Sequence, residues 1–449
     1  MSAESKNPGL KSGSGGEPGR LVAYLNARLV DPASGLDAPG ALLTVGGEIK
    51  DFGPRLFVDG PPSGVASVDC RGHALIPGLI DTRVFVGEPG AEHKETLASA
   101  SEAAAAGGIT TLLCMPNTSP VIDEPAIVEY VARRAHNTSI VNVFPMAAVT
   151  KGLGGKEIAE LGLLKAAGAI AFTDGDRAVA SALVMRRALS YARRFNALIV
   201  QHAEEPALSR DGAMNEGEVA TRLGLPGIPA AAETMMIERD VRLAKLTGGR
   251  LHIGQISCAE SIEVIARAKA EGVEISCGVS PYHFALNETA VGEYRTFCKT
   301  SPPLRPEMDR RAVVAAIADG TIDVIASSHD PQDVESKRQP FAQAAYGMVG
   351  LETMLPLVLE MVHGRKVDLL TALKAMTATP ARLFGLPSGA IRIGAPADLA
   401  LLDLDVPWRI DTERFRSKSK NAPYDARPVQ GRAIMTIVGG RLVHDLYTA

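Results

Sequence analysis

Eight buried, strand-like runs separated by helical patterns constrain the fold of this 449-residue chain more than any other feature. The runs are mostly apolar and rich in β-branched residues, as in "GITTLLCMPN", "NALIVQHAEE" and "VEISCGVSPY". Between them lie helical patterns such as "EPAIVEYVARRAHN" and "ESIEVIARAKAEG", which end at Asn or Gly, residues that commonly stop helices. Strands that are buried on both faces and alternate with helices form parallel sheets. Eight such units predict an α/β fold, a closed (β/α)8 barrel of the TIM type.

The two ends of the chain carry a different pattern, in which short alternating strands are separated by turn glycines. "ALLTVGGEIKDFG" predicts a hairpin with Gly-Gly at its tip, and "LVAYLNARLVDPASG" predicts a strand pair broken at Asp-Pro. We therefore expect residues 21–76 and 389–449 to form one composite domain, a small β-sandwich, with the barrel at residues 77–388. Residues 1–20 are rich in Gly, Ser and Lys without an apolar segment, which predicts a disordered tail and not a signal peptide.

The composition argues against several classes of partner. A formal net charge of -4 and a pI near 6.2 give no basis for binding nucleic acid or an anionic membrane. No run of about 18 apolar residues, the length of a transmembrane helix, occurs. The five cysteines form no CxxC motif and lie mostly in apolar runs, which is typical of reduced core thiols. We expect a cytoplasmic protein.

The histidines are spaced unfavourably for a hydrolytic metal centre. In a barrel of this kind the working residues lie at the carboxyl ends of the strands. An H-x-H pair there supplies two ligands from one strand, because residues i and i+2 point the same way. None of the nine histidines lies within five residues of another, so no such pair exists. Three fall at or just beyond strand ends: a hydrogen-bonded structural role is favoured for His283 and His329, whereas His202, with Asp174 one strand away, could be either structural or a ligand.

Other side chains at the strand ends leave the chemistry open. Asp174 and Asp176 could bind a metal, but a loop aspartate more often caps the next helix. Ser327, His329 and Asp330 are neighbours in sequence, yet neighbours on a strand end point apart and do not form a catalytic triad. No G-x-S-x-G elbow and no phosphate-binding P-loop occurs.

Several segments together resemble the type I dihydroorotases of the amidohydrolase superfamily. The resemblance covers about residues 21–446, and its most specific part is "ALIPGLIDTRVFVGEPGAEHKETLASASEAAAAGGITTLLCMPNTSPVID". Further matches are "AFTDGD", "QHAEE", "SPPLRPEMDRRAVVAAIADGTIDVIASSHDPQ", "GMVGLETMLPL" and "GAPADLALLDLD". The resemblance implies an amidohydrolase barrel. Members of that family reversibly close carbamoyl-aspartate to dihydroorotate in pyrimidine biosynthesis, with a zinc-activated water and an aspartate on the eighth strand as proton shuttle.

The family's motif, carried over position by position, places unsuitable residues at most of the catalytic positions. The two zinc histidines of the first strand fall on Arg83 and Phe85, and the substrate-binding arginine falls on Gly87. The sixth-strand histidine falls on Gln255, and the catalytic aspartate falls on Ser328. An arginine puts a cation where the divalent ion should lie, and a phenyl ring donates nothing.

Some positions of the motif keep the family's residue. Asp174 and His202 match two of the metal ligands, but two donors are fewer than zinc needs. Asn117 matches a substrate-binding asparagine, whereas Ser301 stands where the family has another and Gln332 stands at its last histidine. The remaining substrate side of the site would then consist of Asn117 and Ser301, together with the newly introduced Arg83.

The resemblance implies a dihydroorotase-like protein that is catalytically inactive and needs no cofactor. Metal-less chains of this family serve as structural partners of aspartate carbamoyltransferase, so we expect that enzyme as partner and a homo-oligomer. The alternative is an active dihydroorotase, or another cyclic amidohydrolase, with a rebuilt zinc site. Its ligands would be drawn from Asp174, His202, His283, His329 and Asp330.

A third hypothesis concerns Arg83 itself. With Asn117 and His202 it could hold a small anion, such as dihydroorotate or a related carbamoyl acid, at the mouth of the barrel. The competing interpretation is that Arg83 pairs with Asp174 and merely fills the former metal space.

Overall fold

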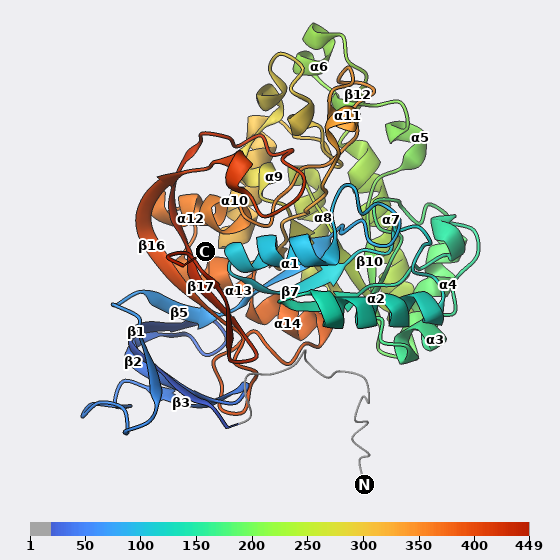
Figure 1. The fold of residues 1–449 in the computed structure, drawn as a ribbon. Helices are drawn as coiled ribbons and strands as arrows, with labels where there is room; N and C mark the ends of the chain where they lie inside the picture. Colours follow the sequence, from blue (N-terminus) through green and yellow to red (C-terminus); the bar gives the residue numbers. More distant parts are fainter. Residues whose placement is uncertain (1–18, 449) are drawn as a thin grey trace.

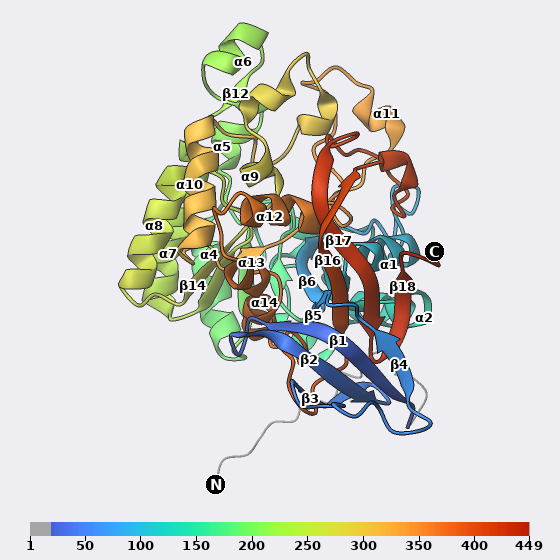
Figure 2. The same ribbon diagram turned by 90° about the vertical axis from the view of Figure 1, so that its left-hand side faces the viewer.

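The computed structural model describes residues 19–448 and combines a barrel of parallel strands with a sheet built from both ends of the chain (Figures 1 and 2). The tail expected at residues 1–20 lies, except for its last two residues, outside the described part of the chain. Within that part no helix is long and apolar enough to cross a membrane.

Eight parallel strands form the barrel, as the sequence predicted. Two hydrogen-bonded sets, one of three strands and one of five, are joined by bridges between Ala147 and Phe172 and between Val84 and His329. The second bridge links the segment after the last strand to the first strand and so closes the ring. The strands are β6 (Leu79–Val84), β7 (Ile109–Cys114), β8 (Asn142–Pro145), β9 (Phe172–Thr173), β10 (Leu198–Gln201), β13 (Arg250–Ile253), β14 (Ile275–Val279) and β15 (Val324–Ile325).

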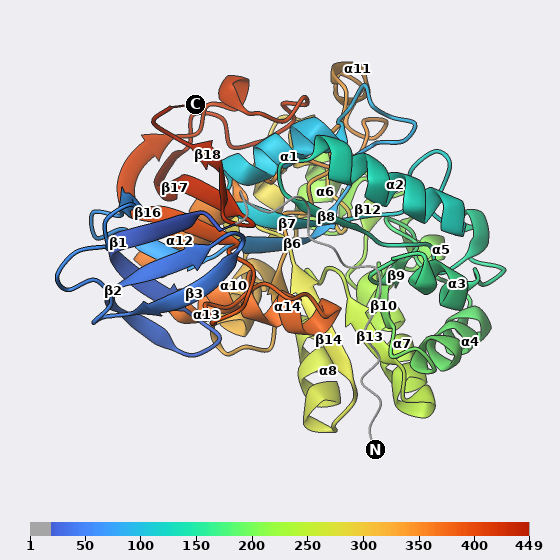
Figure 3. The same ribbon diagram turned by 60° about the horizontal axis from the view of Figure 1, so that its bottom comes forward.

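Helices surround the strands (Figure 3), and the two helical patterns singled out in the sequence are confirmed as α2 and α8. Helix α1 begins at a capping box, in which the Thr96 side chain accepts from Ser99 N. It ends at Gly107, where a Cβ would lie 2.2 Å from Leu351 O, so only glycine fits. The longer helices are α1 (Leu97–Ala106), α2 (Pro125–Thr138), α4 (Ala182–Arg193), α7 (Ala231–Thr247), α8 (Ala259–Ala270), α10 (Glu307–Ala318) and α12 (Met354–His363).

Shorter elements complete the barrel and its loops. The short helices are α3 (Leu161–Ala166), α5 (Pro206–Ser209), α6 (Glu218–Leu223), α9 (Tyr282–Ala285), α11 (Val334–Lys337), α13 (Leu369–Lys374) and α14 (Ala378–Phe384). The 3-10 turns are η1 (Lys151–Leu153), η2 (Glu288–Val291), η3 (Thr296–Cys298) and η4 (Thr412–Arg414), and β11 (Met214–Asn215) pairs with β12 (Gly227–Ile228).

Strands from the two ends of the chain hydrogen-bond into one sheet, in the order β18-β17-β16-β5-β1-β2-β3, with β4 on β1. The ends meet where Leu75 of β5 lies opposite Leu401 of β16. The Gly-Gly hairpin is confirmed between β2 and β3, but the strand pair expected at residues 21–35 is wrong. That segment is mainly one long strand whose register shifts near Asn26, which adopts a positive φ of 53°. The strands are β1 (Leu21–Asp31), β2 (Leu36–Val45), β3 (Glu48–Gly53), β4 (Ala66–Asp69), β5 (Ala74–Pro77), β16 (Leu399–Arg409), β17 (Pro428–Val438) and β18 (Arg441–Asp445).

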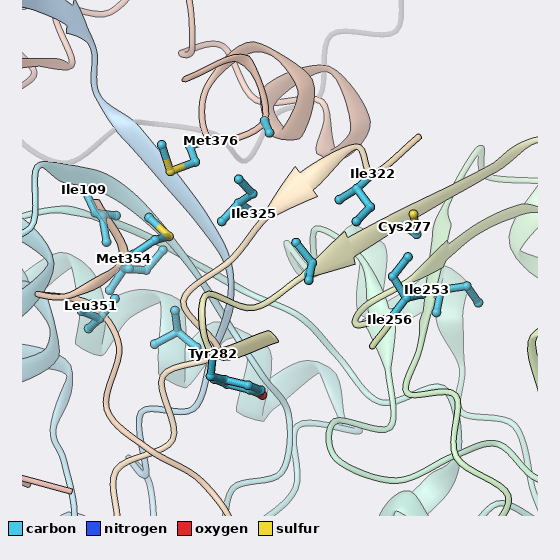
Figure 4. Close-up of a cluster of buried hydrophobic side chains, with 14 of the residues drawn as sticks. Ile109, Ile253, Ile256, Cys277, Tyr282, Ile322, Ile325, Leu351, Met354 and Met376 are labelled. Carbon is cyan, nitrogen blue, oxygen red and sulfur yellow. The ribbon is translucent and has the colours of Figure 1, made fainter. Parts of the chain in front are cut away.

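Apolar side chains from strands and helices fill the space between them (Figure 4). Every residue of β6 and β7 is buried, which explains why these runs are apolar without alternation. A second, smaller core lies within the composite sheet around Leu42, Leu75 and Leu399. All five cysteines are buried and free, as predicted. The domain boundaries drawn at residues 76 and 389 stay a prediction.

Truncation of a core residue should test this packing. Ile109 at the start of β7 is fully buried, so Ile109→Ala should lower the free energy of unfolding by about 2–5 kcal/mol, measured by chemical denaturation. Ile393 is 58% exposed, and Ile393→Ala should change the same quantity by less than about 0.5 kcal/mol. Equal losses in the two variants would contradict the placement of Ile109 in the core.

Candidate functional site

The closed ring brings most of the predicted site residues to one end of the barrel. Arg83 at the end of β6 reaches across to the loop after β9, where its Nη1 donates to Gly175 O over 3.3 Å. A Cβ at Gly175 would lie 3.1 Å from the Asn117 side chain. The carboxyl ends of β6, β7 and β9 therefore converge, and β10, β13 and β15 bring His202, Gln255 and Ser328 to the same end.

Arg83 is a buried cation without a carboxylate partner among the described residues, and its side chain forms one hydrogen bond, to Gly175 O. Burial lowers the pKa of Arg83, while the negative charges of Asp176 and Asp330 act in the opposite direction. A guanidinium stays protonated near neutral pH even so. A full positive charge therefore lies inside the mouth of the barrel.

Asp174, one of the two retained metal-ligand positions, is occupied by hydrogen bonds to the neighbouring loop. Its Oδ1 accepts from Val149 N and Thr150 N, each at 2.9 Å, and its Oδ2 accepts from Thr150 Oγ1 at 2.5 Å. Burial raises the pKa of Asp174. The interpretation that Arg83 pairs with Asp174 is therefore wrong, because the carboxylate is directed to the loop that follows β8.

His202, the other retained position, lies beside neutral groups and the cation. Its Nε2 is 3.0 Å from Ser301 Oγ, which also donates to Glu204 Oε2 over 3.2 Å, and its Nδ1 has no partner among the described residues. Burial lowers the pKa of His202 to about 3, and the Arg83 charge acts in the same direction. The imidazole is therefore neutral at pH 7.

The positions of the family's sixth-strand histidine and catalytic aspartate are joined by a network of hydroxyl groups. Gln255 Nε2 lies 2.6 Å from Ser280 Oγ, 2.5 Å from Tyr282 Oη and 2.8 Å from Ser328 Oγ, and it can donate to two of them at once. Ser280 Oγ and Ser328 Oγ also contact each other. No role was predicted for Tyr282 from the sequence, although its position just after the strand β14 is typical of site residues in such a barrel. This network carries no negative charge to move a proton.

The remaining histidines do not face a common point. The His329 ring Nε2 lies 3.4 Å from Glu95 Oε2, and its Nδ1 accepts from Gly350 N at 3.2 Å. Burial acts to raise the pKa of Glu95, but its contacts with His329 and with hydroxyl groups outweigh burial and lower it. Glu95 is thus an anionic partner that the sequence analysis missed. His283 stacks on Tyr282, and burial lowers its pKa to about 3.

The other predicted site residues also either bond to neighbouring side chains or lie where they cannot serve a metal site. Burial raises the pKa of Asp330 to about 6, and its Oδ1 accepts from Gln332 Nε2 at 2.9 Å, whereas Asp176 is exposed. Phe85 packs in an apolar cluster with Met115 and other side chains. Gly87 has a φ of 80°, and a Cβ there would lie 2.8 Å from Ala91 O, so an arginine would not fit this loop.

These contacts do not fit a zinc centre. In residues 19–448 no three His, Cys, Asp or Glu side chains are grouped so that they could hold a metal ion. Asp174 and His329 are each bound elsewhere, and the buried Arg83 would repel a divalent cation. The unpartnered buried atoms that remain near this end include Asn117 Oδ1 and Gln255 Oε1, which are neutral. These amide oxygens accept hydrogen bonds, so they suit a ligand that presents donor groups, whereas Arg83 suits an anion.

The chain is similar in sequence to proteins named dihydroorotase and in fold to solved structures named hydantoinase or dihydropyrimidinase. A family model described as dihydro-orotase-like matches residues 72–261, and one described as amidohydrolase family matches residues 343–444. The chain is 45% identical over 426 residues to a dihydroorotase of Anaplasma phagocytophilum, covering 94% of this chain and 95% of that one. It is 43% identical to a dihydroorotase of Geotalea daltonii, covering 93% and 97%.

Solved structures give the same result for the fold. The L-hydantoinase (dihydropyrimidinase) from Arthrobacter aurescens superimposes with a TM-score of 0.85 at 25% identity, covering 94% of this chain and 96% of that one. The dihydropyrimidinase from Brevibacillus agri does so with a TM-score of 0.81 at 20% identity, covering 95% of each.

Metal analysis tests the fit of the site to zinc. The chain purified from zinc-supplemented cells should hold far less than one zinc per chain, because Arg83, Phe85 and Gln255 replace ligands and Asp174 is engaged. The measurement is elemental analysis by mass spectrometry, with the Anaplasma phagocytophilum dihydroorotase purified in parallel. Near-stoichiometric zinc whose removal lowers the thermal stability of the chain would contradict this interpretation.

Asp81 on β6 gives a pH-dependent prediction. It is fully buried, its Oδ2 has no partner among the described residues, and burial raises its pKa from 3.8 to about 6. The folded state therefore holds this proton more tightly than the unfolded state does, so Asp81 stabilises the fold at low pH. That contribution, up to ~3 kcal/mol, is lost as the pH rises from about 4 to above 6.

The variant Asp81→Asn should accordingly lose less stability than the unmodified chain between pH 4 and pH 7, as measured by denaturation at each pH. The exposed Asp211 offers a matched control, and Asp211→Asn should follow the pH profile of the unmodified chain. If the stability of Asp81→Asn varied with pH as that of the unmodified chain does, the buried carboxyl of Asp81 would not be the cause of the pH dependence.

Proposed function

This chain belongs to the dihydroorotase family, and we propose that it is a noncatalytic member that stabilises an assembly of pyrimidine biosynthesis with aspartate carbamoyltransferase as partner. The observation that carries the proposal is Arg83, a buried cation at the position of the first zinc histidine. It disfavours a divalent ion through Coulomb repulsion in a space of low dielectric constant.

Three requirements of cyclic-amide hydrolysis are unmet in this arrangement. Water that is not bound to a metal keeps a pKa near 15.7 and is a poor nucleophile at neutral pH. The family's proton-shuttle position holds Ser328, whose hydroxyl contacts Gln255 and Ser280 and cannot act as a general base of suitable pKa. Gly87 stands at the position of the substrate-binding arginine, so no guanidinium group is available there to donate two hydrogen bonds to a carboxylate. The losses affect binding, activation and proton transfer together.

The intact scaffold supports a role for the outer surface of the protein. The barrel is closed, its core is filled, and the composite sheet is continuous. The choice of aspartate carbamoyltransferase rests on the resemblance to metal-less family members, as does the expectation of a homo-oligomer and of a place in the cytoplasm. A structural partner needs a stable surface and no reactive centre.

A second candidate function is the binding of a small anion at the mouth of the barrel. Arg83 has no carboxylate partner among the described residues, and His202 Nδ1, which can donate a hydrogen bond in one tautomer, is buried without a partner there. A buried charge is costly unless it is paired, so an anionic ligand would relieve it. The hypothesis of an active amidohydrolase with a rebuilt metal site, favoured by 45% identity to a named dihydroorotase, would require Asp174 and His329 to leave their present partners.

Two measurements on the purified chain test the main proposal. The chain should not hydrolyse dihydroorotate above the buffer rate, whereas the Anaplasma phagocytophilum dihydroorotase should do so in the same assay. Mixed with aspartate carbamoyltransferase from the same genome, the chain should co-elute as a defined complex in size-exclusion chromatography and raise the transferase's melting temperature. Turnover at an ordinary enzymatic rate, about 1 s⁻¹ or more, would refute inactivity. Separate elution at micromolar concentrations would refute the partnership.

A further inference from the structure

A second cavity lies at the opposite end of the barrel from the residues described above. It encloses about 740 Å³, within the size range of small-molecule sites. The strand residues Asn142, Leu198 and Arg250 that line it are the first residues of β8, β10 and β13, so it lies at the amino-terminal ends of the strands. The last residues of α2, α3 and α14 also line it.

The charged side chains that line this cavity are all cationic. Lys165, Arg250, Arg382 and Arg441 reach it, and no Asp or Glu is among its lining residues. Asp398 contacts one lining residue, since it accepts from Asn142 Nδ2 at 2.9 Å. A single aspartate cannot balance four cations.

Helix ends explain only part of this charge. Lys165 donates to Phe195 O, and Arg250 donates to Asn196 O at 3.1 Å and to Leu383 O at 2.7 Å, so both satisfy main-chain carbonyls. A helix carboxyl end carries roughly half a negative charge, so the ends of α2, α3 and α14 together offset fewer than two cations. Within residues 19–448 the Arg382 and Arg441 side chains form no hydrogen bond or ion pair. Their guanidinium groups are available to a ligand.

The cavity also has an apolar floor. Leu198, Leu383 and Phe384 are buried members of an apolar cluster, and Phe144 and Ile170 pack against it as partly buried neighbours. Neutral polar residues, among them Asn137, Ser139 and Asn196, also line the cavity. A cationic rim above an apolar, partly aromatic floor is suited to a ligand with a flat ring at one end and a multiply charged anion at the other.

We propose that this cavity binds an organic phosphate, of the nucleoside diphosphate class, with its ring on the floor at Phe144 and Phe384 and its phosphates at Arg382 and Arg441. Arginine favours phosphate because its planar fork donates two parallel hydrogen bonds. The site is remote from the barrel mouth and independent of whether that end catalyses a reaction.

Calorimetric titration of the full-length chain with adenosine 5′-diphosphate tests the proposal. Saturable binding of one nucleotide per chain is expected, with pyrophosphate and adenosine each at least about tenfold weaker. The absence of saturable binding at millimolar nucleotide would overturn the proposal. Pyrophosphate binding as tight as the nucleotide's would overturn it too, because the floor would then contribute nothing.

A charge-reversal variant locates the binding site. Arg382→Glu/Arg441→Glu should weaken nucleotide binding by at least about tenfold. The exposed Arg222 and Arg338 give a matched control, since Arg222→Glu/Arg338→Glu makes the same change in net charge elsewhere and should leave binding unchanged. Unaltered binding in the first variant, or an equal loss in both, would overturn the proposal. If the first variant does not fold, Arg382→Ala and Arg441→Ala are measured singly against the same criteria.

Discussion

The closure of the barrel is the constraint on which the site depends. Val84 pairs with His329, and Phe85 N donates to His329 O at 2.9 Å, so the last strand segment is tied to the first. Closure directs the strand ends toward a small space that excludes water. In such a space every polar group must find a partner or incur a desolvation cost. The chemistry of this end of the barrel is therefore decided by which partners are within reach.

The partners that form here differ from those a metal would impose. Asp174 bonds to Thr150, His329 lies against Glu95, and Gln255 joins a group of hydroxyls. Each contact satisfies a side chain locally and removes it from any shared point. Arg83 keeps a full charge with a main-chain carbonyl as its hydrogen-bond partner. A loss of one ligand could have left a weakened metal site, whereas a cation at its centre changes the sign of the local potential.

The two ends of the barrel also differ for a reason that lies in the architecture. Helices run antiparallel to the strands, so their carboxyl ends, with partial negative charge, gather at the amino-terminal ends of the strands. The Lys165 and Arg250 side chains offset part of this negative charge, because they donate hydrogen bonds to main-chain carbonyls. With Arg382 and Arg441 added, the positive charge at this cavity is larger than the negative charge of the helix ends, so this end of the barrel is positive. At the mouth, the buried Arg83 side chain contributes a positive charge.

The sequence by itself determined the eight strands, the surrounding helices and the hairpin at Gly46, because these follow from local periodicity and residue chemistry. It could not determine the partner of Arg83 or Asp174, the role of Glu95 and Tyr282, or the cationic cavity at Arg382 and Arg441. Those depend on contacts between residues far apart in the chain. The strand pair expected within residues 21–35 was wrong for a similar reason, since pairing with β2 and β5 keeps β1 continuous from Leu21 to Asp31. Residues on opposite sides of the ring come close to one another only when the barrel has closed.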